Sequence, residues 1–305
     1  MNPDIEIFTP PFPLKTAVLF LVFNRLESTK RVFKAISRAK PPRLYIAADG
    51  ARPSKPGEAN VVQEVRDYLI GNIDWDCEVR TLFRDCNLGC KRAVSSAVDW
   101  FFDNEEMGII LEDDCLPSQS FFWYSQSLLE KYLHDTRIFL ISGYNKKNIW
   151  NAEKRDYFFS QLGGIWGWAS WRRVWEHYDI EMKDIGEFML ENNFQNLFGK
   201  ELGPIREKII YHGIFTNKTD TWDYQFAYAM NKNSGLACVP SKNLVVNIGF
   251  GPDATHTITP NSDIVALHEI PFPLRDNPFI VKDSLYDYHF VFSNSRLKWL
   301  KKLFY

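Results

Sequence analysis

The chain has 305 residues, of which 45% are hydrophobic and 24% are charged, and its formal net charge at pH 7 is −2. This length allows one large domain or two moderate ones with a sizeable core. No basic stripe runs through the sequence, which argues against nucleic acid as the main partner. The longest apolar run, residues 17–23, is far shorter than the roughly 20 residues of a membrane span.

The five cysteines are odd in number and include no C-x-x-C pair with zinc-ligand spacing. No secretory signal leads the sequence, so we expect a cytoplasmic protein that keeps its thiols reduced.

Strand and helix patterns alternate through the first 115 residues. Strand patterns cover 16–25, which reads as a fully buried parallel strand, and 43–50, 77–85 and 107–114. Apolar residues at helical spacing cover 27–42, 58–71 and 87–104. This alternation is typical of an α/β protein with a doubly wound, Rossmann-like sheet flanked by helices.

Ligands of such sheets bind at the carboxyl ends of the strands. Polar residues stand at the ends of three expected strands: Asn24 and Arg25, Asp49 and Gly50, and the triplet Glu112, Asp113 and Asp114. We therefore expect these residues to meet at one edge of the sheet.

The second half is less regular. It begins with an amphipathic helix over 118–134 and a strand over 137–145, followed by a Gly-Gly turn and four tryptophans between 166 and 175. A helix is predicted over 221–235, and a glycine-rich loop covers 249–257.

The chain ends in apolar and basic residues at roughly helical spacing over 296–304. A basic amphipathic helix of this kind can lie on an anionic membrane, here the inner face of the cell membrane. The alternative is a helix docked on the core.

The acidic triplet needs a cation, because unit charges 4 Å apart repel by about 1 kcal/mol in water and by more in a cleft. Carboxylate oxygens are preferred ligands of Mn²⁺ and Mg²⁺. Two alternatives are a turn whose acids cap the helix after Pro117, and a receiver or phosphatase site. The latter classes place an Asp at the end of the first strand, where this chain has Asn24 and Arg25.

The segments "AVLFLVFNR" (17–25), "LYIAADG" (44–50), "IILEDDCLPSQSFFWY" (109–124), "FLISGYN" (139–145) and "WDYQF" (222–226) occur in this order. Together they resemble the GT-A glycosyltransferases related to N-acetylglucosaminyltransferase I and its bacterial relatives. The resemblance spans about residues 15–260, and the acidic triplet followed by "PSQSFF" is its most specific element.

The resemblance implies a mixed GT-A sheet, a nucleotide-sugar donor, Mn²⁺ (or Mg²⁺) as the cofactor, and inversion at the anomeric carbon. It implies that Asp114 binds the metal, Asp113 the ribose and Glu112 the donor sugar. Asp49 matches the acid that contacts uracil, which favours UDP over GDP, and Arg25 matches a basic residue beside the nucleotide.

The same resemblance assigns the catalytic base to Asp223, with Trp222 beside the reacting centre. Without the resemblance, an Asp at the start of a helix is better explained as a cap or as a partner of the helix dipole.

Further candidate site residues are assigned because they occupy the same place in the order of segments as functional residues of the family. Gly249, Gly251 and Thr255 fall in a loop that closes over the diphosphate, and His256 is a second candidate metal ligand. The remaining candidates are Asn24 and Arg92 (or Lys91) for the nucleotide, and Gly164 and Trp166 for the donor sugar or acceptor. A solvated helix face explains Lys91 and Arg92 equally well, and core packing is an alternative for the tryptophans.

We expect one catalytic domain over 1–285, with a nucleotide-binding half (14–115) and a metal- and acceptor-binding half (116–285), and a basic tail over 286–305. Residues 180–215 match nothing in the family and are expected to help bind a glycan or lipid-linked saccharide acceptor. Two other functions stay open: a non-catalytic nucleotide- or carbohydrate-binding protein on a transferase scaffold, and a metal-dependent phosphotransfer enzyme.

Overall fold

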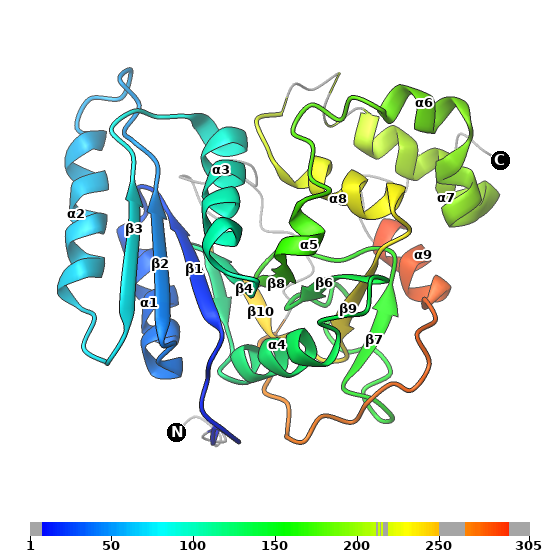
Figure 1. The fold of residues 1–305 in the computed structure, drawn as a ribbon, viewed down its shortest axis with the longest axis horizontal. Coiled ribbons are helices and arrows are strands. Elements are labelled where there is room, and N and C mark those ends of the chain that lie inside the picture. Colours follow the sequence, from blue (N-terminus) through cyan, green and yellow to red (C-terminus); the bar gives the residue numbers. More distant parts are fainter. Residues whose placement is uncertain (1–7, 212, 214, 216–218, 250–265, 293–305) are drawn as a thin grey trace.

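The structure is a computed structural model, and it describes residues 8–211, 213, 215, 219–249 and 266–292. Eight strands form one central sheet in the order β3-β2-β1-β4-β8-β6-β9-β7 (Figure 1). The predicted mixed α/β sheet flanked by helices is therefore confirmed. The strands of this sheet are β1 (Ala17–Val22), β2 (Arg43–Ala48), β3 (Glu78–Phe83), β4 (Met107–Glu112), β6 (Ile138–Ser142), β7 (Tyr157–Ser160), β8 (Trp168–Trp171) and β9 (Leu236–Pro240).

The first half of the sheet is parallel, because helices cross over between its strands. These helices are α1 (Leu26–Ala39), α2 (Glu58–Gly71) and α3 (Gly89–Asn104). The chain moves outward from β1 to β2 and β3 and then returns through α3 to place β4 on the other side of β1. The strand order therefore reverses between β1 and β4, which is the position where open α/β sheets bind ligands.

The second half of the sheet is mixed: β8 runs antiparallel to both β4 and β6, whereas β6 and β9 are parallel. Its helices are α4 (Ser120–Lys131), α5 (Arg172–Trp175), α6 (Ile185–Leu190), α7 (Asn193–Tyr211), α8 (Asp223–Lys232) and α9 (Ser284–Phe292). In Figure 1, α6, α7 and α8 gather at the same end of this half, away from α4.

A short second ribbon joins the two halves of the chain. In it, β5 (Cys115–Pro117) pairs antiparallel with β10 (Val245–Asn247). The amide of Ile248 also donates a hydrogen bond to the carbonyl of Asp114 (2.7 Å), so the chain after β10 lies beside the acidic triplet.

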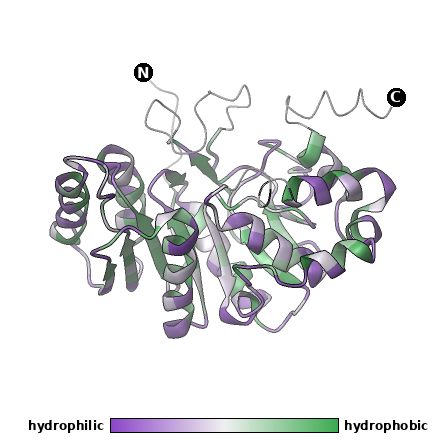
Figure 2. Cartoon of the chain, turned by 90° about the horizontal axis from the view of Figure 1, so that it is seen from above, coloured by the Kyte–Doolittle hydropathy of each residue, from purple (hydrophilic) through white to green (hydrophobic). Residues whose placement is uncertain are grey.

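One hydrophobic core runs through both halves, and helices cover its sheet (Figure 2). The edge strand β3 is the exception, because most of its residues are exposed. A smaller core cluster lies between α6, α7, α8 and α9. The predicted boundary at 285/286 falls inside α9, where Tyr286 and Asp287 are buried, so residues 286–292 belong to the folded domain. This position corrects the predicted start of the tail, whereas residues 296–304 lie outside the described part of the chain.

Within the described residues, no helix is both long enough and apolar enough to cross a membrane.

Candidate functional site

The ends of β1 and β4 meet as predicted, and direct contacts join them. The Nη1 atom of Arg25 lies 2.7 Å from Oδ2 of Asp114 and 3.7 Å from Oδ1 of Asp113. The amide of Phe23 donates a hydrogen bond to the second carboxylate oxygen of Asp113 (3.2 Å). Asp113 and Asp114 are turn residues directly after β4, so their side chains turn back toward the end of β1.

Glu112 is the last residue of β4 and lies within electrostatic range of Asp223, which belongs to the second half of the chain. Burial raises the pKa of Glu112 to about 8, and the carboxylates of Asp114, Asp113 and Asp223 add to this rise. Asp113 accepts a hydrogen bond from the β1 backbone and Asp114 is ion-paired with Arg25, whereas the pKa of Glu112 is also affected by Asp223.

Asp223 is the first residue of α8, and the hydroxyl of Thr221 donates a hydrogen bond to its Oδ1. It belongs to the second half of the chain, yet it lies close enough to Glu112 to affect its pKa. The thiol of Cys90, at the start of α3, is another neighbour: burial raises its pKa to about 12, with further contributions from Glu112, Asp220 and Asp223. The structure therefore brings the predicted base and the acidic triplet together across the two halves.

The acidic residues do not form a closed metal centre by themselves. In the part of the chain that the structure describes, no three His, Cys, Asp or Glu side chains converge on one point. The donor set still suits a hard cation: Asp113 and Asp114 are ion-paired with Arg25, and among the described residues no ion pair is found for Glu112 or Asp223. The carboxylate of Asp114 would be the ligand that this chain provides to such an ion, and oxygen atoms of bound molecules would be the other ligands.

The candidate lid loop is described only at its first residue. A Cβ atom on Gly249 would collide with Oδ2 of Asp114. Because Gly249 has no side chain, the loop can approach Asp114, the candidate metal ligand. Gly251, Thr255 and His256 lie outside the described residues, and their roles stay predictions.

Asp49 lies at the end of β2, but its carboxylate is already surrounded by hydrogen-bond donors. It accepts bonds from the amides of Gly50, Leu88 and Gly89 (3.0–3.2 Å) and from Nδ2 of Asn87 (2.9 Å). These bonds hold the loop before α3 against β2. The structure thus gives Asp49 a structural role, and its contact with uracil stays a prediction.

Asn24 also has a partner within the chain. Its side-chain amide donates to Oε1 of Glu58 (2.9 Å), and Glu58 is ion-paired with Arg52. The Arg52 guanidinium lowers the pKa of Glu58 to about 2. Asn24 and Glu58 therefore link the end of β1 to the loop between β2 and α2, and the role of Asn24 in nucleotide binding stays a prediction.

The aromatic candidates separate into core and rim. Trp222 is 2% exposed and stacks on Trp168, with ring centroids 5.5 Å apart. Trp222 therefore packs in the core, and its place beside the reacting centre stays a prediction. Trp166 is half-buried beside Tyr144 at 4.5 Å, and Gly164 also packs against Tyr144.

Trp166 and Gly164 lie at the rim of the site, because Ile110 of β4 pairs with Trp168 of β8. The chain just before β8 therefore passes alongside the end of β4, where Glu112 stands. Arg92 on α3 is exposed, and its role in nucleotide binding stays a prediction.

Sequence reasoning missed two residues near Asp223. Asp220 contacts the start of α3, and its only sequence signal is that it lies three residues before Asp223. Arg206 on α7 donates to Oδ1 of Asn231 (3.3 Å), and burial lowers its pKa to about 10 while Tyr224 and Asp223 oppose that shift. Arg206 falls in the 180–215 segment, where no motif pointed to any particular residue.

No protein-family model matches this sequence, and no curated protein matches it. Distant resemblances to solved structures exist. A Pyrobaculum calidifontis mannosyltransferase, PcManGT, in complex with GDP-Man and Mn²⁺, is 14% identical over 59% of this chain and 52% of its own (TM-score 0.38). The chain thus matches about half the length of that protein.

Two other solved structures cover more of the chain. TarS 1–349 of S. aureus is 9% identical over 77% of this chain and 60% of its own (TM-score 0.43). An inositol-1-phosphate CTP transferase of T. maritima is 10% identical over 77% of this chain and 89% of its own (TM-score 0.41). Similarities this distant do not indicate a function, which must be argued from the site.

Proposed function

We propose that the protein is an inverting, metal-dependent glycosyltransferase that moves a sugar from a UDP-sugar to a hydroxyl group of a glycan or glycolipid acceptor. The observation that carries this proposal is the position of Asp223 beside the acidic end of β4, at the point where the strand order reverses. The nucleotide half supplies the triplet and the second half supplies the base, as a reaction between two substrates requires.

Asp223 is the residue that takes the proton. Its place at the start of α8, at the border of the two halves, suits a carboxylate that receives a proton from the attacking acceptor hydroxyl. General base catalysis of this kind contributes about 10²- to 10⁴-fold in rate. The Thr221 hydroxyl holds one carboxylate oxygen and leaves the other for the acceptor.

The residues beyond β1 and β4 hold the donor. Asp114 would bind the divalent cation, and Asp113 and Arg25 would contact the ribose and the phosphates. When bound, the cation supplies several kcal/mol of stabilisation to the departing nucleoside diphosphate. Arg25 would stabilise the negative charges of the same diphosphate, since a guanidinium forms strong hydrogen bonds to phosphate oxygens.

The test is release of nucleoside diphosphate from a panel of UDP- and GDP-sugars, with and without Mn²⁺, by the wild type and by Asp223→Asn and Asp114→Asn. Asp223→Asn keeps the acceptor for Thr221 but cannot take a proton, so we expect turnover to fall about 10²-fold or more while UDP still binds. Asp114→Asn should lose the response to Mn²⁺. Asp74→Asn, an exposed residue away from the site, is the matched control.

Full activity of Asp223→Asn would contradict the mechanism. Binding of nucleotide sugars by the wild type without any turnover would instead indicate a non-catalytic binding protein.

A further inference from the structure

The start of α3 is capped by carboxylates from both halves of the molecule. Four backbone N–H groups at a helix start have no partner within the helix. Those of Leu88 and Gly89 donate to Asp49, as described above. Those of Cys90 and Lys91 donate to the two carboxylate oxygens of Asp220, at 2.8 and 3.1 Å. The residue at the N-cap position, Leu88, has no side-chain oxygen to offer, so the caps come from elsewhere.

Asp220 lies 130 residues from Cys90 in the chain and three residues before Asp223. Its carboxylate therefore ties the segment that leads into α8 to the start of α3. Gly89 makes this approach possible: its φ is +77°, and a Cβ atom there would lie 2.5 Å from Oδ2 of Asp220. The helix dipole strengthens these bonds, because the positive end of α3 faces a negative charge.

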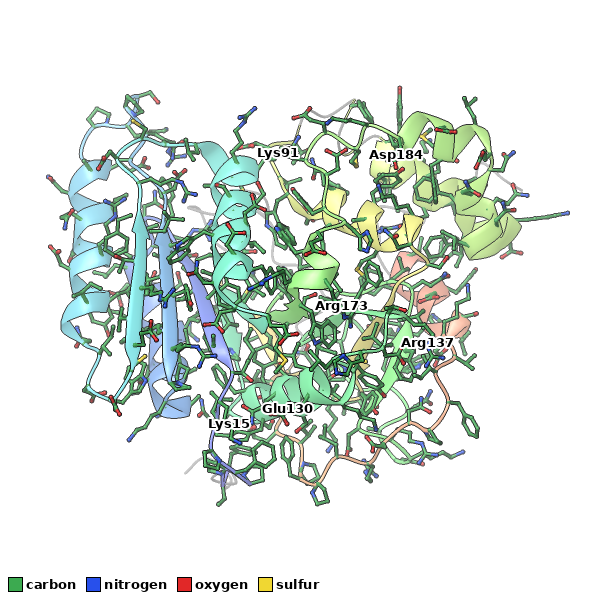
Figure 3. All side chains as sticks on the ribbon, viewed as in Figure 1. Lys15, Lys91, Glu130, Arg137, Arg173 and Asp184 are labelled. Carbon is green, nitrogen blue, oxygen red and sulfur yellow. The ribbon has the colours of Figure 1, made fainter. Side chains whose placement is uncertain are left out.

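A second link joins the same two helix starts. Figure 3 shows Lys91 at the start of α3, on the side that faces the segment leading into α8. With the Gln225 amide oriented to satisfy its neighbours, its NH₂ group donates to the carbonyls of Thr221 (3.0 Å) and Trp222 (3.2 Å). Its oxygen then accepts from Nζ of Lys91 at 3.2 Å. Gln225 is 2% exposed, so this link is shielded from water.

We propose that Asp220 is a positioning residue that holds Asp223 at its working distance from the acidic triplet. This inference rests on the proposed role of Asp223 as the base. Asp223 belongs to one half of the chain and Glu112 to the other, so their separation depends on how α8 sits against α3. Asp220 makes direct bonds between these helix starts and belongs to the turn that carries Asp223. Displacements of about 1 Å at a reacting group cost up to about 10²-fold in rate.

The test compares Asp220→Ala with Asp220→Asn in donor turnover. Asp220→Ala removes both bonds at an exposed position, so the fold should survive. We expect kcat to fall about ten- to a hundredfold while the donor KM and the affinity for UDP stay unchanged. Asp220→Asn keeps one acceptor oxygen and should recover most of kcat. Gly89→Ala, which puts a methyl group where Asp220 sits, should act in the same direction as Asp220→Ala.

Two kinetic outcomes would overturn the inference. An unchanged kcat in Asp220→Ala would mean that the contact does not position the base. A lower donor KM in the same variant would mean that Asp220 competes with the donor phosphates for the start of α3. Asp74→Ala is the matched control for loss of an exposed aspartate.

Hydrogen exchange separates this inference from the proposed function, because it needs no turnover. In Asp220→Ala the amides of 88–92 and 219–226 should exchange faster, with the rest of the chain unchanged. Unchanged exchange in these two segments would overturn the link even if the wild type is an active transferase. Faster exchange with no turnover by the wild type would support the link and reject the proposed function.

Discussion

The guanidinium of Arg25 lies 2.7 Å from the carboxylate of Asp114, although the two residues are 89 positions apart in the chain. They follow neighbouring parallel strands, β1 and β4, and meet where the strand order reverses. The side chains are 21% and 14% exposed, so the pair lies at the edge of the protein rather than in its core. Arg25 thus neutralises the very carboxylate that the proposed mechanism assigns to a metal ion.

We expect Arg25→Met to bind Mn²⁺ more tightly than the wild type. Removing the guanidinium frees Asp114 and removes a positive charge next to the incoming ion. The gain should be up to about fivefold, since partly exposed ion pairs are worth up to about 1 kcal/mol. Titration calorimetry with Mn²⁺ alone measures this directly. Arg25→Met/Asp114→Asn should lose the gain, and weaker binding by Arg25→Met would show that the residues do not compete.

Asp49→Asn should lower stability rather than change the choice of nucleotide. An Asn amide would turn its NH₂ group toward N–H donors that now bond to carboxylate oxygens. Leaving such donors unpaired costs about 2 kcal/mol of unfolding free energy. Chemical denaturation measures the loss, and competition between UDP and GDP measures specificity. A stable variant that no longer prefers UDP would support the role in contacting uracil instead.

Trp222→Phe and Trp166→Phe should separate packing from binding. Trp222 is 2% exposed and stacked on Trp168, so we expect its truncation to cost about 2 kcal/mol of unfolding free energy and to leave the donor KM unchanged. Trp166 lies at the rim, so its substitution should change the unfolding free energy little and raise the KM for donor or acceptor. A raised KM in Trp222→Phe, without loss of stability, would contradict the core role.

Asp287→Asn should stabilise the protein at neutral pH but not at pH 4. Burial raises the pKa of Asp287 to about 6, whereas the Ser160 hydroxyl and Lys282 oppose that rise and Asp283 adds to it. The Asp287 carboxylate also raises the pKa of Arg206, against the effect of burial. Because the folded-state pKa is above the usual 3.8, this group contributes stability below pH 4 that is lost as the pH rises through 6.

Asn does not ionise, so the Asp287→Asn variant does not lose stability at this position as the pH rises. A shift of about two pKa units corresponds to about 3 kcal/mol. The difference in unfolding free energy between Asp287→Asn and the wild type should therefore grow by up to that amount between pH 4 and pH 8. A difference that stays constant with pH would show that Asp287 keeps an ordinary pKa in the folded protein.

Local patterns carried much of the fold. The alternation of strand and helix through the first 115 residues predicted β1 to β4 and α1 to α3, because apolar periodicity reports directly which face of an element is buried. The helix at 221–235 was also predicted from spacing, and α8 lies within it. The short strand β5 was not predicted separately, because a three-residue strand carries too few residues for a period to show.

The tail boundary and the role of Trp222 illustrate a different limit. An apolar side chain looks the same in the sequence whether it faces a ligand or the core. Only packing shows that Trp222 lies against Trp168 and that α9 docks on the domain.

The sequence by itself determined which residues stand at the ends of the strands, because strand ends are local features of the chain. It thereby placed Arg25, the acidic triplet and Asp49 at one edge of the sheet. Only the tertiary structure decided which partners those side chains take. Asp49 turns toward the α3 loop, Arg25 toward Asp114, and Asp220 reaches α3 from the opposite half. Such contacts join residues 39 to 130 positions apart, so the way the two halves pack selects them.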